Sequence, residues 1–72
     1  MGVNGIGKQI RERRDTLGLT QPDLAEMAGI SKNTLYKIET GQGNPTLNVL
    51  HKIAQILGME FTMTVQKPGQ NR

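Results

Sequence analysis

The chain has 72 residues, one histidine, no cysteine and a formal net charge of +3, a basic excess that fits a polyanionic partner. A chain this short forms one domain at most, and because its core rarely supplies more than about 3–5 kcal/mol, a second copy is the simplest added source of stability. The composition excludes disulfides, thiolate metal sites and a membrane span, and with no signal segment we expect a cytoplasmic protein without a cofactor.

The first predicted element is a helix over residues 5–17, after a flexible start over residues 1–5. Apolar side chains recur through it at helical spacing, at Ile6, Ile10 and Leu17. Arg14 occupies the vacant position on the same stripe, which predicts that this charged residue points inward. Gly18 is placed to end the helix.

Two short helices are predicted next, over residues 21–28 and 32–39. A capping pattern begins at Thr20, Ser31 caps the second helix, and Gly29 lies where the chain must reverse. The inner faces are apolar, with Leu24, Ala25, Ala28, Leu35 and Ile38. Two short helices joined by a tight glycine turn form a helix-turn-helix, and in DNA-binding examples the second helix enters the major groove.

The last predicted helix spans residues 47–57, capped by Thr46 and ended by Gly58. Its inward residues are Leu47, Leu50, Ile53, Ala54 and Leu57. Alternating apolar residues then predict a short strand over residues 59–67, followed by a disordered tail over residues 68–72. The apolar face of the strand carries Phe61, Met63 and Val65. A lone strand leaves backbone groups unpaired, so we expect it to pair with the same segment of a second chain.

The stretch "GKQIRERRDTLGLTQPDLAEMAGISKNTLYKIETGQGNPTLNVLHKIAQILG" resembles the lambda-repressor-like, or Xre-type, helix-turn-helix proteins. It carries R-x-x-x-G-L-T-Q, L-A, G-I-S, I-E-x-G, P-T-L and L-x-x-I-A-x-x-L-G. The resemblance covers residues 6–58 and implies a mainly α, compact bundle of four to five helices that binds operator DNA as a homodimer. The segment "LGMEFTMTVQKP" resembles the HipB-like antitoxins, in which a short strand pairs across the dimer.

The resemblance also implies roles for individual residues. The positions that read bases correspond to Lys32, Asn33, Tyr36 and Lys37. The positions at helix ends or near the DNA backbone correspond to Gln21, Ser31 and Thr34. Arg14 and Glu39 match a pair that forms a buried salt bridge in some relatives. Two residues depart from the pattern, since Pro22 replaces an acidic or polar residue and Tyr36 is bulkier than its HipB-like counterpart.

Simpler structural interpretations stand beside these roles. The face formed by Lys32, Asn33 and Lys37 is on its own equally typical of a solvated helix surface. Tyr36 also fits surface packing on the preceding helix, and Gln21 also fits an ordinary helix start. The backbone N–H groups of a first helical turn bind phosphate in any case, so they are expected to serve better than the Gln21 side chain. His51 has no base–nucleophile partner and is expected to be a surface histidine.

Two functions remain open from the sequence. The first is a DNA-binding repressor that binds a palindromic operator as a homodimer, in one form as the antitoxin of a kinase-type toxin whose shared operon it represses. The second is a protein-interaction module that neutralises a toxin without operator binding, although the polar residues of the third helix argue against it. No group of residues indicates an enzyme. The sequence does not separate an antitoxin from a phage-type repressor or a restriction controller.

Overall fold

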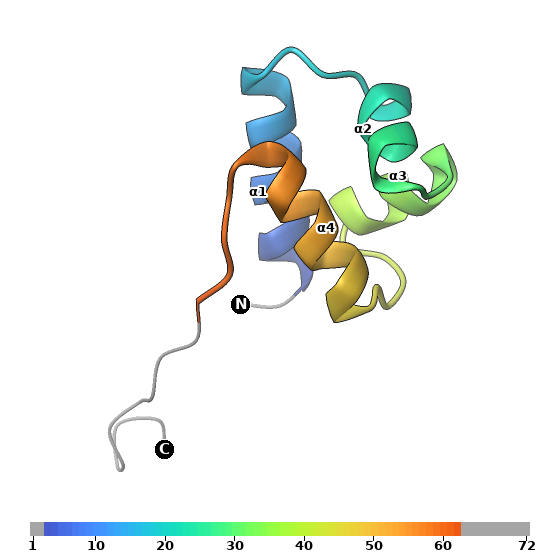
Figure 1. The fold of residues 1–72 in the computed structure, drawn as a ribbon. Coiled ribbons are helices and arrows are strands. Elements are labelled where there is room, and N and C mark those ends of the chain that lie inside the picture. Colours follow the sequence, from blue (N-terminus) through green and yellow to red (C-terminus); the bar gives the residue numbers. More distant parts are fainter. Residues whose placement is uncertain (1–2, 63–72) are drawn as a thin grey trace, which may run out of the picture.

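The computed structural model of the protein describes residues 3–62. Its four helices are α1 (Val3–Thr16), α2 (Gln21–Ala28), α3 (Lys32–Glu39) and α4 (Leu47–Leu57). Figure 1 shows α1 beside α4, with the α2–α3 pair on one side of them. Both α1 and α2 pack against α3 and α4, so the fold is a compact four-helix arrangement around one core. No helix in residues 3–62 has the length and apolar character that a membrane span requires.

Local hydrogen bonds set the ends of the last three helices. The Thr20 hydroxyl accepts from the backbone N–H of Asp23, whose carboxylate accepts from the Thr20 N–H in return. Ser31 and Thr46 cap α3 and α4 through the same kind of hydroxyl contact. Gly58 ends α4 in the left-handed region, with φ of 71°. The bounds of α2, α3 and α4 therefore agree with those predicted from capping residues.

The core forms where the apolar stripes of the four helices meet. Its largest fully buried side chains are Leu24, Leu35, Ile53 and Leu57. Two residues predicted to point inward do not, because Leu17 is 44% exposed and Leu47 is 71% exposed. Leu17 lies beyond the last residue of α1, and Leu47 is the first residue of α4. Each stripe therefore extends by one residue past the region that the neighbouring helices cover.

The first helix begins earlier than predicted, at Val3, within the segment expected to be flexible. It approaches α3 closely at Gly7, where a Cβ atom would collide with the carbonyl oxygen of Ile38 and lie 2.9 Å from that of Glu39. Only a residue without a side chain allows two backbones to come this near. The carboxyl end of α3 thus rests directly on the backbone of α1.

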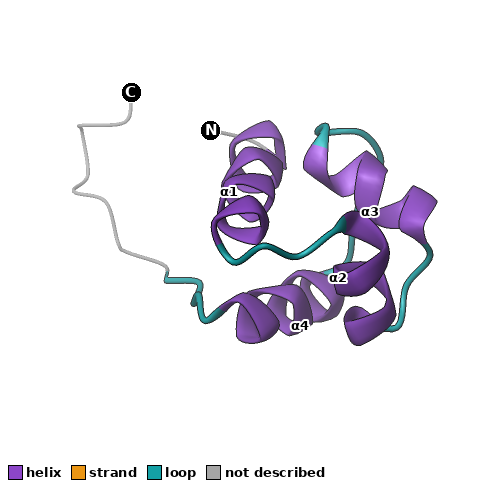
Figure 2. Ribbon diagram, turned by 90° about the horizontal axis from the view of Figure 1, so that it is seen from above, coloured by secondary structure: helices purple, strands orange, loops and turns teal. Residues whose placement is uncertain are grey.

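The predicted C-terminal strand is not present in the described residues. Residues 59–62 have no regular secondary structure, and Figure 2 shows them as a loop that leaves the end of α4. The Met59 N–H donates to the Ala54 carbonyl at 2.8 Å, which completes the end of α4. A strand needs a paired neighbour, and residues 3–62 offer none to this segment. Met63, Val65 and the predicted tail lie outside the described residues.

Candidate nucleic-acid interface

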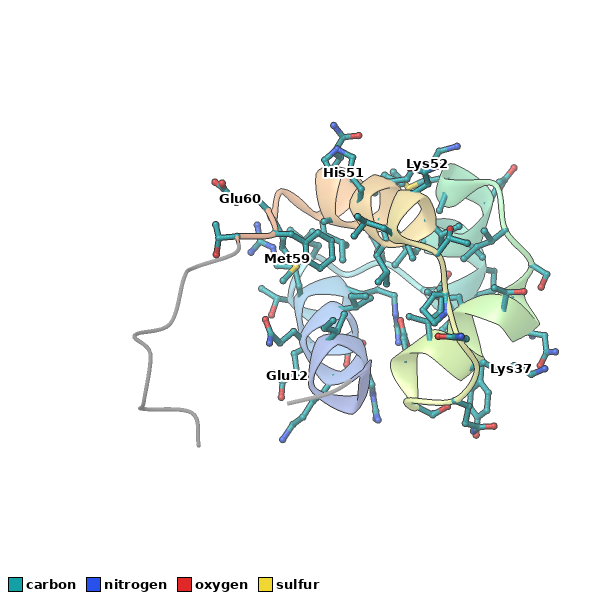
Figure 3. All side chains as sticks on the ribbon, turned by 90° about the horizontal axis from the view of Figure 1, so that it is seen from below. Glu12, Lys37, His51, Lys52, Met59 and Glu60 are labelled. Carbon is teal, nitrogen blue, oxygen red and sulfur yellow. The ribbon has the colours of Figure 1, made fainter. Side chains whose placement is uncertain are left out.

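One side of α3 presents polar side chains to solvent. The residues predicted to read bases are all exposed there, namely Lys32, Asn33, Tyr36 and Lys37. Their spacing places them on one side of the helix, opposite the buried Leu35 and Ile38. Tyr36 is 49% exposed, and Figure 3 shows Lys37 projecting outward from α3. The structure therefore brings two cations, one amide and one phenol together on a single surface.

The start of α3 is organised by Ser31 and Thr34. The Ser31 hydroxyl oxygen accepts from the Thr34 backbone N–H at 3.0 Å, and the same hydroxyl donates to the Thr34 hydroxyl at 2.8 Å. Ser31 is therefore committed to the cap. The hydrogen of the Thr34 hydroxyl remains available to an acceptor outside the protein, such as a phosphate oxygen.

A buried ion pair lies behind this surface. The Nε of Arg14 donates to Oε2 of Glu39 at 2.7 Å, and its Nη2 donates to Oε1 at 3.1 Å. The Nη1 of Arg14 also donates to the Leu19 carbonyl at 2.9 Å. The hydrogen bond to Glu39 raises the pKa of Arg14, against the opposing effect of burial, so the guanidinium stays charged. These contacts join α1 and the loop after it to the carboxyl end of α3.

The amide of Gln21 is also turned toward this pair. Gln21 is the first residue of α2, is partly buried, and donates from Nε2 to Oε1 of Glu39 at 2.9 Å. No pattern in the sequence predicts this bond. It joins residues 18 positions apart and depends on the angle between α2 and α3, which no local pattern encodes.

The first turn of α2 offers fewer backbone N–H groups than expected. Pro22 has none, the Asp23 N–H donates to the Thr20 hydroxyl at 3.1 Å, and the Leu24 N–H donates to the Thr20 carbonyl. The Gln21 N–H is the one that remains within this turn, and the Asp23 carboxylate lies close by. Fewer backbone N–H groups are therefore open to a phosphate here than in an ordinary first turn, and the expectation that they serve it better than the Gln21 side chain stays a prediction.

The basic residues of α1, Lys8, Arg11, Arg13 and Arg14, do not form one solvated face, since Arg13 as well as Arg14 is drawn into the fold. Arg13 is partly buried, and its Nε donates to the Leu57 carbonyl at 2.9 Å. This bond fixes α1 to the end of α4, 44 residues further along the chain. The exposed cations of α1 are then Lys8 and Arg11.

The described residues show no group suited to metal binding. Within residues 3–62, no three His, Cys, Asp or Glu side chains gather closely enough to hold an ion. His51 is exposed, and it projects from the outer side of α4 in Figure 3. The exposed side of α3 can instead donate hydrogen bonds and supply positive charge. This combination suits recognition of an anionic polymer that carries polar edges.

A helix-turn-helix family model matches residues 10–63 of the chain. A relative from Methanothermobacter thermautotrophicus, described as an uncharacterized HTH-type transcriptional regulator, is 47% identical over 51 residues, which are 71% of this chain and 74% of the relative. Other relatives are longer, and the chain spans only 16% of a 41% identical regulator from Methanocaldococcus jannaschii.

Two solved structures share the fold at appreciable sequence identity. The restriction-modification controller protein C.AhdI from Aeromonas hydrophila has a TM-score of 0.76 and 33% identity, over 81% of this chain and 88% of that one. SinR, a master regulator for biofilm formation solved in complex with DNA, has a TM-score of 0.69 and 36% identity. The SinR match covers 76% of this chain and 89% of that one.

Proposed function

This chain belongs to the helix-turn-helix family, whose relatives are transcriptional regulators and not enzymes, and from that premise we propose that it regulates transcription by binding duplex DNA at specific sequences. The observation that carries the proposal is the exposed polar side of α3, the second helix of the motif. That SinR was solved with DNA supports it. In such motifs this helix enters the major groove, where base pairs differ in their donors and acceptors.

Each exposed residue of α3 has a chemical role in this proposal. The ammonium groups of Lys32 and Lys37 donate to the O6 and N7 atoms of guanine, and the amide of Asn33 pairs with adenine. Tyr36 contributes its phenol and apolar ring at the same surface. Gln21 and Thr34 contact phosphate and fix the position of the protein on the duplex, while Ser31 holds the start of α3 in shape.

We propose further that the protein acts as a homodimeric repressor on a palindromic operator. A hollow of about 260 Å³ opens between α1, α4 and residues 59–62. Its apolar lining includes Ile6, Ile10, Ala54, Met59 and Phe61, and the Phe61 side chain is 40% exposed. A small domain with an apolar hollow gains stability when a second copy covers it. Two recognition helices related by a two-fold axis would read an inverted repeat.

A toxin–antitoxin role is not part of this proposal. The resemblance to HipB-like antitoxins rests on a strand over residues 59–67, and residues 59–62 do not form one. Residues 59–62 therefore add no support for a kinase-type toxin partner. The alternative of an interaction module without DNA binding is disfavoured by α3 itself, because its one acidic residue, Glu39, is buried and its exposed charges are Lys32 and Lys37.

The test is selection of bound duplexes from a random pool at low salt. We expect enrichment of an inverted repeat whose half-site centres lie about 10 base pairs apart, or a multiple of that spacing. Affinity for the selected duplex should fall about 10³-fold or more between 50 and 200 mM salt, since several phosphates release counterions on binding. Retention of no sequence at low salt would overturn the proposal, and a direct repeat would overturn the symmetric dimer.

A further inference from the structure

Three parts of the chain meet at one buried carboxylate. Oε2 of Glu39 accepts from Arg14, and Oε1 accepts from both Arg14 and Gln21. The side chain of Glu39 is only 1% exposed. Within residues 3–62 no buried side-chain nitrogen or oxygen lacks a hydrogen-bond partner. Glu39 therefore lies too deep to touch DNA, yet it contacts Gln21, which the proposed function assigns to a phosphate.

The charge of Glu39 decides which way the Gln21 amide faces. A side-chain amide has a carbonyl on one side and an NH₂ group on the other, and it can present either one. A carboxylate has only acceptors, so the NH₂ group of Gln21 must face Glu39. Arg14 holds the carboxylate in place through two bonds, which fixes the amide further. One hydrogen of Nε2 then remains without a partner among the described residues.

The remaining hydrogen matters because the backbone nearby has little to offer an anion. Gln21 supplies the one free N–H in the first turn of α2, and the carboxylate of Asp23 lies next to it. A phosphate approaching this turn therefore finds two donors, the backbone N–H and the side-chain amide of Gln21. An amide that is already oriented binds such a group without losing further rotational freedom.

We propose that Glu39 is a positioning residue for DNA binding, which acts by orienting Gln21 so that its second N–H meets a phosphate oxygen. The proposal rests on the proposed function, since it assumes a duplex at this surface. The proposal gives the buried pair a role beyond stability. Glu39 belongs to α3, which carries the base contacts, and it bonds to Gln21 of α2, which carries the phosphate contact.

A double-mutant cycle on DNA affinity tests this role. The first variant is Gln21→Met, which keeps the length of the side chain and removes its hydrogen bonds. The second is Arg14→Met with Glu39→Gln, which removes the carboxylate charge that orients the Gln21 amide. Because Arg14 is replaced at the same time, no buried guanidinium is left without a partner. The third combines all of these changes. Ile53→Val, a core change on α4, serves as a control for lost stability alone.

We expect Gln21→Met to weaken binding about tenfold per half-site on selected and unrelated duplexes alike, with an unchanged salt slope because glutamine is neutral. The Arg14→Met and Glu39→Gln pair should weaken binding similarly, and the combined variant should bind no worse than Gln21→Met. Additive losses would overturn the inference, since Glu39 would then act independently of Gln21. Binding is measured where circular dichroism shows every variant folded, and Ile53→Val should bind like the natural protein.

Failure of this inference is distinguishable from failure of the proposed function. If the natural protein binds duplex DNA and Gln21→Met binds every duplex with the same affinity as the natural protein, the inference alone is wrong. If the natural protein binds no duplex, both are wrong. A measurement without variants provides a second check, since the side-chain NH₂ of Gln21 should exchange with solvent more slowly than that of the exposed Gln55 in NMR spectra. Equal exchange rates would overturn the fixed orientation.

Discussion

At the scale of single residues, polar side chains near α3 divide by the direction in which they point. Asn33 and its exposed neighbours face solvent, whereas Arg14, Gln21 and Glu39 face one another. In the proposed function, the outward group determines which sequence is bound. The inward group joins α1, α2 and α3 and so holds these helices in place relative to one another. Changes in the outward group should therefore alter sequence preference, whereas changes in the inward group should alter stability.

Asn33→Ala should lower affinity for the selected duplex by about 1–3 kcal/mol and relax the preference at one base pair. The reason is that an amide paired with a base carries sequence information, whereas the helix itself loses little because Asn33 is exposed. Repeating the duplex selection with the variant measures both effects. Gln55→Ala, which changes an exposed amide on α4, should leave the selected motif and the affinity unchanged. An unaltered motif for Asn33→Ala would mean that Asn33 does not read a base.

Glu39→Ala should destabilise the fold by about 3–5 kcal/mol, because it removes the buried carboxylate that pairs with Arg14 and leaves only the exposed Asp15 near the guanidinium, at 3.4 Å. Changing both residues, as Arg14→Met and Glu39→Leu, should recover much of the loss, since no buried charge then remains. Because the folded-state pKa of Arg14 is raised, its contribution is fully present throughout the neutral range and is lost only in strong alkali. Urea unfolding at neutral pH measures both variants. A single variant as stable as the natural protein would contradict a structural role for the pair.

How well the position of a single side chain could be predicted depends on how far along the sequence its contacts lie. The exposed side of α3 follows from helical spacing alone, so Lys32 and Asn33 could be placed on it from the sequence. The inward position of Arg14 follows from the apolar stripe that it interrupts. The bonds of Arg13 to Leu57 and of Gln21 to Glu39 could not be predicted, because they depend on how whole helices pack across 44 and 18 residues.

At the scale of elements, the ends of helices were predictable where the signal is local. Thr20, Ser31 and Thr46 each bond within three residues of themselves, so the sequence alone predicts the starts of α2, α3 and α4. The sequence carries no Ser, Thr, Asp or Asn ahead of Val3, so no capping signal predicts the start of α1, and its end was predicted one residue too late. The strand was predicted from alternation and from the HipB-like resemblance, yet strand formation depends on a pairing partner, which residues 3–62 do not supply.

Gly7→Ala should destabilise the protein by about 1–3 kcal/mol, because the new methyl group would collide with the Ile38 carbonyl oxygen at the carboxyl end of α3. Alanine favours helix over glycine by about 1 kcal/mol, but the obstacle here is backbone and cannot rotate away. Gln9→Ala, on the exposed side of the same helix, is the matched control and should be neutral or slightly stabilising. Urea unfolding compares the two. A stabilised Gly7→Ala variant would show that α1 and α3 do not approach this closely.

At the scale of the whole molecule, the proposed dimer depends on the segment that begins where α4 ends. Met59 packs against the core, and Phe61 lies beside the hollow between α1 and α4. Holding two recognition helices at a fixed separation turns two weak half-sites into one strong site through effective concentration. The segment after Gly58 is therefore expected to matter for operator affinity even if it touches no DNA.

Two truncations separate the contributions of this segment. Ending the chain after Thr62 removes Met63 and Val65 of the predicted dimer strand and retains every described contact, so the helical fold should be kept while self-association weakens. Ending it after Gly58 also removes Met59 and Phe61, which should weaken self-association further and cost some stability. Sedimentation measures association, and circular dichroism checks the fold. In both variants operator affinity should fall while the slope of log affinity against log salt concentration changes little. The reason is that the lost residues link two half-sites and contact no phosphate. An unchanged monomer–dimer equilibrium after the Gly58 truncation would exclude this segment from the dimer interface.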